Sequence, residues 1–123
     1  MRFHHLGFFC RSIEIGLTHF QGIHQITDIS KVYRDVQLGV EVQFFIVDGF
    51  LRYELVAPFG KKNPVDGVLD SKKNILNHVG YITDDFDKEV ISLREKKHMV
   101  IAGPKPALAF GKKRVIFFLT PLG

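Results

Sequence analysis

The sequence is poor in cysteine and has no long apolar run. Its only cysteine, Cys10, cannot form a disulfide within the chain, which favours a reducing compartment. No stretch approaches the ~20 apolar residues that a membrane helix needs. The opening residues, Met-Arg-Phe-His-His, are not followed by the apolar core of a signal peptide. These absences predict a cytoplasmic domain that does not engage a membrane.

Charge is in modest excess, with a formal net charge of +4. The simplest interpretation of the surplus is solvated surface lysine, and the alternative is a rim that binds a phosphate-bearing small molecule. No nucleic-acid-binding motif accompanies the charge, so we expect a small-molecule substrate and no nucleic acid. The surplus lies in four short clusters: Lys61-Lys62, Lys72-Lys73, Lys96-Lys97 and Lys112-Lys113-Arg114.

An internal repeat organises the chain. The segment from His5 to Phe9 (HLGFF) reappears from His78 to Ile82 (HVGYI), 73 residues later. At the same offset, residues 42–45 (VQFF) return as residues 115–118 (VIFF). Two matches in one register indicate a duplicated module. We therefore predict a single domain made of module one (1–57), a linker (58–73) and module two (74–123).

Each copy has the pattern of a β-α-β-β-β module. The first helix is expected to begin at the N-cap Ser12, and the second at Asp84 or Asp85. A helical turn is expected after Pro64 in the linker, and residues 103–106 (GPKP) are expected to form a stiff loop. The strands are expected at residues 3–10, 25–34 (weakly), 40–47, 50–57, 76–83, 99–102 and 113–120.

Module two lacks the strand that would correspond to residues 50–57 of module one. Glu54 plus the offset of 73 gives position 127, beyond the 123 residues of the sequence. A sheet without this strand exposes backbone groups that another chain can pair with. We therefore expect a homodimer, formed by edge pairing or by strand exchange.

Two histidines and one glutamate are the candidate metal ligands. His5 and His78 occupy equivalent places on the first strand of each module, and Glu54 lies on a neighbouring strand. A lone strand histidine is more often structural, but a pair related by a repeat favours a shared site. Two imidazoles and a carboxylate suit divalent Zn, Ni, Co, Mn or Fe about equally. His4 points to the opposite face of its strand and is a weaker candidate.

Four segments carry a resemblance to a known family: residues 4–9 (HHLGFF), 53–65 (YELVAPFGKKNPV), 77–82 (NHVGYI) and 113–121 (KRVIFFLTP). Together they resemble the vicinal-oxygen-chelate (glyoxalase/bleomycin-resistance) superfamily, and within it the methylmalonyl-CoA epimerases. The resemblance implies an α+β fold with a curved mixed sheet, and a dimer. It also implies that His5, Glu54 and His78 match three of four metal positions. Around them we assign Gln43, Tyr53 and Tyr81 to substrate binding.

The sequence departs from that family at two positions that matter for chemistry. The family's fourth ligand is a Glu on the last strand, which this sequence lacks. Gln37 stands where an epimerase carries a carboxylate base, and an amide cannot remove a proton from carbon at a useful rate. Two functions therefore stay open. One is a metal-dependent isomerase, epimerase or lyase acting through an enolate on a small acyl or oxo compound, possibly a CoA thioester. The other is a binding module that retains the fold without the chemistry.

Overall fold

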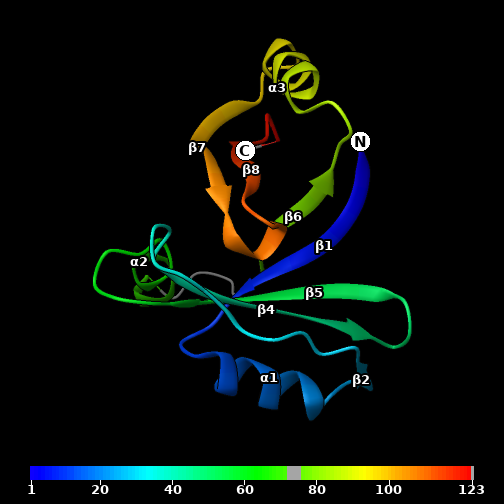
Figure 1. The fold of residues 1–123 in the computed structure, drawn as a ribbon, viewed down its shortest axis with the longest axis vertical. Coiled ribbons are helices and arrows are strands. Elements are labelled where there is room, and N and C mark those ends of the chain that lie inside the picture. The colour runs from blue at the N-terminus through cyan, green and yellow to red at the C-terminus, as the bar shows by residue number, and fades with distance from the viewer. Residues whose placement is uncertain (72–75, 123) are drawn as a thin grey trace. The chain divides into compact units, whose positions relative to one another are not determined.

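The computed structural model describes residues 1–71 and 76–122, and has the predicted α+β architecture with a mixed sheet (Figure 1). The larger sheet is six-stranded in the order β2-β4-β5-β1-β6, with β3 also paired to β4; β7 and β8 form a second sheet. The elements are β1 (Arg2–Phe9), α1 (Ile13–Gln21), β2 (Ile26–Thr27), β3 (Tyr33–Asp35), β4 (Val40–Val47), β5 (Leu51–Pro58), α2 (Asp66–Asp70), β6 (Leu76–Ile82), α3 (Phe86–Glu95), β7 (Met99–Ala107), a 3-10 turn (Leu108–Phe110) and β8 (Lys113–Leu119).

The chain forms two compact units. One is Phe3–Gly80; the other combines Met1–Arg2 with Tyr81–Gly123. This boundary differs from the module boundaries expected from the repeat. The modules at 1–57 and 74–123 therefore stay a prediction about the repeat in the sequence.

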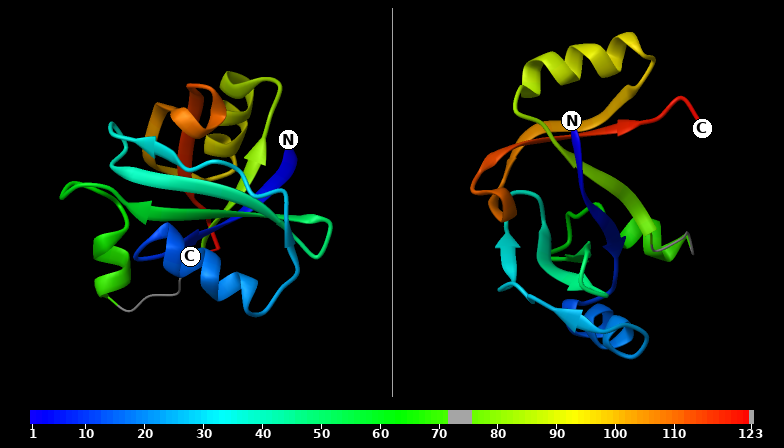
Figure 2. Two further views of the ribbon diagram at one scale, coloured as in Figure 1. Left: turned by 60° about the horizontal axis from the view of Figure 1, so that its bottom comes forward. Right: turned by 90° about the vertical axis from the view of Figure 1, so that its right-hand side faces the viewer.

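The Phe3–Gly80 unit contains the well-packed core. Helix α1 lies against β4 and β5, as Figure 2 shows. The helix begins at the predicted cap, where Ser12 Oγ accepts a hydrogen bond from the Ile15 amide at 3.1 Å. Phe20 on the helix then packs against Phe45 and Leu55 on the sheet. Because one face of the sheet packs against α1, only the opposite face is available for a binding site.

The strand register decides which side chains share a face. β1 runs parallel to β5, whereas β4 runs antiparallel to it, so the sheet is mixed. Gly7 lies beside Glu54, and Phe44 lies beside Glu54 from the other flank. Because side chains alternate along a strand, Glu54 and Phe44 lie on one face and Phe45 on the other.

The weak strand expected at residues 25–34 is in fact two short strands, β2 and β3, both antiparallel to β4. Between them Asp28 has a φ of 53°, a left-handed conformation that interrupts an extended strand. The alternating pattern was therefore correct only in part, because alternation in sequence does not reveal a break in backbone conformation.

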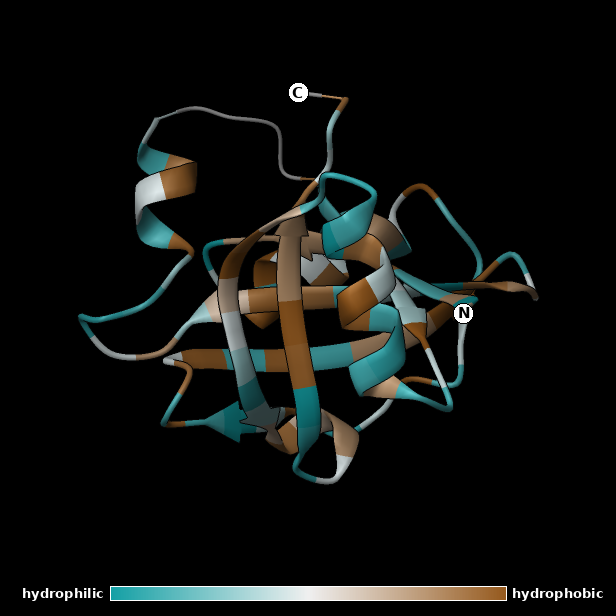
Figure 3. Cartoon of the chain, turned by 90° about the horizontal axis from the view of Figure 1, so that it is seen from above, coloured by the Kyte–Doolittle hydropathy of each residue, from teal (hydrophilic) through white to brown (hydrophobic). Residues whose placement is uncertain are grey.

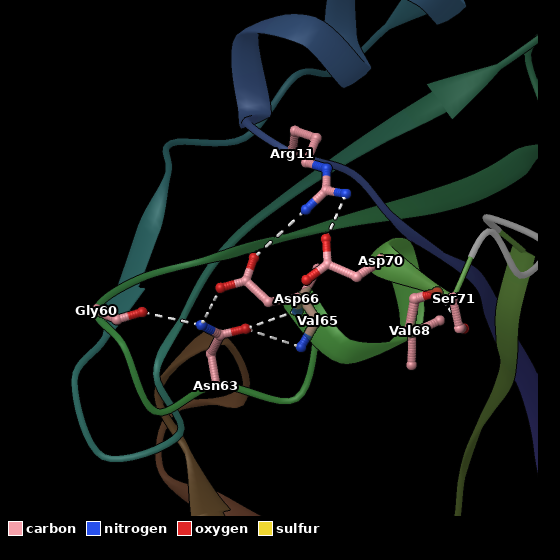
Figure 4. A network of polar contacts seen from close by, with 8 residues as sticks. All are labelled: Arg11, Gly60, Asn63, Val65, Asp66, Val68, Asp70 and Ser71. Carbon is pink, nitrogen blue, oxygen red and sulfur yellow. Dashed lines mark hydrogen bonds and ion pairs between the residues drawn. The ribbon is translucent and has the colours of Figure 1, made fainter.

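The linker is tied to the end of β1 by a polar network (Figure 4). Asn63 Oδ1 accepts hydrogen bonds from the backbone amides of Val65 and Asp66, both at 2.9 Å, just before α2. Its Nδ2 donates to the carbonyl of Gly60 at 2.9 Å. Arg11 donates to Asp70 at 2.8 Å. The helical turn expected after Pro64 is thus present as α2.

In the second unit, β7 and β8 form an antiparallel hairpin. Asp85 caps α3 by accepting from the Lys88 amide at 3.2 Å. The stiff loop expected at residues 103–106 is wrong, because these residues belong to β7. The strand tolerates them through register shifts between residues 100 and 102 and between 102 and 105, and Gly103 takes a φ of 86° there. Apolar residues run along much of the hairpin (Figure 3).

The offset of 73 also relates the elements of the structure. Shifted by it, α1 covers 86–94 and β4 covers 113–120, close to the bounds of α3 and β8. β2 and β3 together correspond to the single strand β7. Within residues 1–71 and 76–122, no strand follows β8. None of the described helices has the length and apolarity to cross a membrane.

Candidate metal centre

Three neighbouring strands bring together the three candidate ligands named from the sequence. His5 lies on β1, Glu54 on β5 and His78 on β6, and β1 is the middle strand of the three. All three residues belong to the Phe3–Gly80 unit. Their nitrogen and oxygen atoms lie within 4.8 Å of one another, a group that could hold a metal ion. His5 and Glu54 are buried, and the side chain of His78 is 16% exposed.

The spacing of these atoms suits a single ion. His5 Nε2 lies 3.1 Å from His78 Nε2. Glu54 Oε1 lies 3.2 Å from His78 Nε2 and 3.7 Å from His5 Nε2. Ligand atoms held about 2.1 Å from one ion are separated by about 3.0 Å at octahedral angles and about 3.4 Å at tetrahedral angles. Two imidazoles and a carboxylate also match the donors that divalent transition metals prefer. The residues present therefore fit such an ion.

Two glycines make room for the imidazoles. A Cβ atom built on Gly7 would collide with the ring of His78, and one built on Gly80 would collide with the ring of His5. Each glycine stands two residues after one histidine and beneath the ring of the other. This explains why both copies carry His-x-Gly. The repeated His-x-Gly spacing was visible in the sequence, but the purpose of its glycines was not.

Burial keeps the imidazole of His5 in the neutral form that a metal ion requires. Burial is the largest cause that lowers the pKa of His5 from 6.5 to about 4, against the opposing charge of Glu54. His78, His4 and Arg52 lower it further. Burial followed by Arg52 also lowers the pKa of His4. His5 is thus neutral at pH 7 and able to donate a lone pair.

Phe44 and Arg52 form a wall beside the three residues. The ring of Phe44 lies edge-on to His5, with centroids 5.9 Å apart. Arg52 donates to the backbone carbonyl of His4 at 3.3 Å. Both also line a cavity of about 340 Å³ together with Asp28, Phe45 and Ile46. The apolar character of Phe44 does not show in the sequence which of the two faces it lies on.

The three residues assigned to substrate binding are not gathered here. Gln43 and Tyr53 alternate with Phe44 and Glu54, and so lie on the opposite face of the sheet. Gln43 Nε2 donates to the carbonyl of Ser30 at 2.9 Å. Tyr53 packs against Phe8, Phe20, His24 and Phe45. Tyr81 belongs to the other unit and is 55% exposed.

The remaining candidates contribute little to this site. Gln37, which replaces the expected base, is exposed in the turn between β3 and β4. Cys10, the single cysteine, is also no nucleophile at neutral pH, because burial raises the pKa of its thiol to about 11. The cluster Lys72-Lys73 lies outside the described residues, and the lysines of the other clusters are exposed.

Comparison with solved structures shows one fold. A hypothetical protein of Bacillus halodurans superposes with a TM-score of 0.80 at 17% identity, over 96% of this chain and 83% of the other. Methylmalonyl-CoA epimerase from Mycobacterium tuberculosis gives a TM-score of 0.79 at 14% identity, over 96% of this chain and 78% of the other. The Streptomyces coelicolor methylmalonyl-CoA epimerase in complex with 2-nitronate-propionyl-CoA gives a TM-score of 0.76 at 18% identity, over 97% of this chain and 87% of the other.

No curated protein matched the sequence significantly. A family model, in contrast, matches residues 4–117, a span that contains all three candidate ligands. Its family is described as the Glyoxalase/Bleomycin resistance protein/Dioxygenase superfamily. The match covers nearly the whole chain and agrees with the mixed sheet seen here. This chain therefore belongs to the Glyoxalase/Bleomycin resistance protein/Dioxygenase superfamily.

Proposed function

We propose that this chain is a metal-dependent enzyme of the superfamily that acts on a small acyl or oxo compound, in the manner of an epimerase, isomerase or lyase. The observation that supports the proposal most directly is the convergence of His5, Glu54 and His78 within 4.8 Å. A divalent ion bound there would supply positive charge to stabilise an enolate oxygen. The ion could be Zn, Ni, Co, Mn or Fe.

The chain's own residues have defined tasks in this proposal. His5 and His78 offer neutral nitrogens, and Glu54 supplies the negative charge that partly offsets the charge of the ion. Phe44 shields His5 from water on one flank. Arg52, which lines the adjoining cavity, places a positive charge where an anionic substrate group could bind. A thioester of coenzyme A has such groups, and related epimerases make it the first substrate class to test.

A second function, a small-molecule-binding module, is favoured by one specific observation. The described metal-ligand group contains a single carboxylate, Glu54. Moving a proton from one face of a carbon to the other requires basic groups on both faces. Gln37 cannot act as one of them, and it is exposed in a turn. Retention of the fold and the cleft without efficient proton transfer would give a protein that only sequesters its ligand.

The deciding experiment is elemental analysis of the purified protein, followed by an exchange assay in D2O. We expect about one equivalent of a transition metal, lost in the His5→Ala, His78→Ala double variant. Methylmalonyl-CoA should then gain deuterium at its α-carbon in the presence of wild type and not of the double variant. Metal uptake without deuterium exchange would favour the binding module. Folded protein that takes up no added metal would rule out the metal-dependent enzyme.

A further inference from the structure

The residue immediately before each candidate ligand contacts the ligand's imidazole. His4 Nδ1 lies 2.9 Å from His5 Nδ1, and Asn77 Oδ1 lies 3.0 Å from His78 Nδ1. Residues 4 and 77 are related by the same offset of 73 as the two histidines. The contact is therefore repeated in the two modules, although the residues that make it differ.

Adjacency in sequence does not explain this contact. Neighbouring side chains of a strand point to opposite faces, so they seldom hydrogen-bond to one another. Here the side chains at both positions turn back to reach the Nδ1 atom of the next residue. In both cases the contacted nitrogen is the one farther from Glu54, because Nε2 is the nitrogen that faces the carboxylate.

The chemistry of these contacts favours one orientation of each ring. A neutral imidazole carries one N–H, and the other nitrogen carries a lone pair. The Oδ1 atom of Asn77 only accepts, so it is a partner for an N–H at His78 Nδ1. Between His4 and His5, either Nδ1 atom can donate to the other, depending on the tautomers of the two rings. Both contacts hold Nδ1 of a ligand and leave its Nε2 turned toward Glu54.

We propose that His4 and Asn77 are positioning residues that hold the rings of His5 and His78 with Nε2 turned toward Glu54 and a divalent transition metal. This inference rests on the proposed metal-dependent function. Partners of this kind generally orient a metal-ligating histidine, and their loss typically lowers metal affinity by about 10–100-fold. The His4 contact is part-buried and the Asn77 contact is exposed, so substitution of His4 should have the larger effect.

Nitrogen NMR tests the contacts without metal. Long-range ¹H–¹⁵N spectra of the histidine-labelled, metal-free chain at pH 8 give the Nδ1 chemical shift of each imidazole. His4→Phe should change the Nδ1 shift of His5, and Asn77→Leu that of His78, because each substitution removes the partner of that atom. Asn77→Asp, which keeps an acceptor, should leave the Nδ1 shift of His78 close to that of wild type. Unchanged Nδ1 shifts in the first two variants would overturn the proposal.

Zinc affinity, measured by competition with a chelator, is the second readout. We expect about 10–100-fold weaker binding in Asn77→Leu and His4→Phe, and near wild-type binding in Asn77→Asp. The matched control is His19→Phe, the same substitution at an exposed position of α1. Equal affinities in all variants would contradict a positioning role. If the wild type binds no zinc, the metal-dependent function fails, while the NMR spectra still decide whether His4 and Asn77 contact the Nδ1 atoms of His5 and His78.

Discussion

At the scale of single residues, the two glycines beneath the imidazoles are as important to the site as the ligands. Alanine at position 7 or 80 would put a methyl group into the ring of the histidine from the other module. The ring must move or the strands must separate. Either response displaces one histidine ligand but leaves its imidazole present. These variants therefore test the position of the ligand separately from the kind of atom that it offers to a metal.

We therefore expect Gly7→Ala and Gly80→Ala to weaken metal binding by about 10–100-fold, comparable to the loss of a ligand's supporting contact. Overpacking should also lower the free energy of unfolding by about 1–3 kcal/mol. Zinc competition and urea denaturation measure the two effects. Gly67→Ala is the matched control, because a Cβ atom there meets nothing within 4 Å. Wild-type affinity in Gly7→Ala would show that the ring packing is unimportant.

The buried His5 makes the stability of the metal-free protein depend on pH. Its pKa is lowered to about 4, below the 6.5 of an exposed imidazole, so between these values the unfolded chain holds a proton that the folded chain does not. Protonation thus favours unfolding. The free energy of unfolding should fall as pH decreases through this window, by about 3 kcal/mol at its lower end.

Urea denaturation in the presence of a strong chelator, from pH 7.5 to pH 4, tests this expectation. The His5→Gln variant is the control, since it cannot take up the proton, and its stability should depend less steeply on pH. The lowered pKa of His4 acts in the same direction and leaves a residual slope. A stability that rises on acidification in wild type would contradict the expected sign.

At the scale of elements, the linker network around Asn63 determines how α2 begins. Helix α2 is only five residues long, and its N-cap residue, Val65, makes no side-chain cap. The amide groups that a cap would satisfy are bonded by Asn63 instead. We expect Asn63→Ala to lower the free energy of unfolding by about 1–2 kcal/mol in urea denaturation.

The neighbouring Lys62→Ala is the control for this variant, because that side chain is exposed and substitutions of such residues usually change stability by less than about 0.5 kcal/mol. Equal effects of the two substitutions would mean that the Asn63 hydrogen bonds are exchanged for water without cost.

At the scale of the whole molecule, the repeat predicted that His5 and His78 meet, because a duplicated pattern relates distant parts of a chain. The family resemblance implied the fold class, and Glu54 was added because it lies on a neighbouring strand. His5 and His78 could be paired from their offset alone. The face of the sheet on which Gln43 and Tyr53 lie could not be predicted from the repeat, since it depends on strand register. The contact of His4 and the role of Gly7 depend on ring orientations, which sequence patterns do not encode. Only residues 99–102 of strand β7 were predicted as a strand, because the Gly and Pro residues that follow usually indicate a loop.

The two units also differ in how well they are packed. The largest fully buried side chains, Phe45, Leu55, Val47 and Val65, all belong to Phe3–Gly80. Among the described residues of the second unit, only Ala107 is buried. That unit also has a cavity of about 440 Å³ lined by α3 and the β7–β8 hairpin, including Phe86, Val90 and Ile116. Met99, Ile101 and Leu119 remain exposed on the hairpin.

This contrast predicts that the two units open separately in hydrogen exchange. Local opening requires less free energy where few apolar contacts are lost, so amides of α3 and β8 should exchange much faster than those of β4 and β5. Mass spectrometry of the whole chain at two protein concentrations measures both rates. If the expected homodimer covers the exposed hairpin, exchange in β7 and β8 should slow at the higher concentration while β4 and β5 stay unchanged. Exchange in β7 and β8 that does not depend on concentration would argue against dimerisation through this hairpin. Equal protection in both units would contradict the difference in packing.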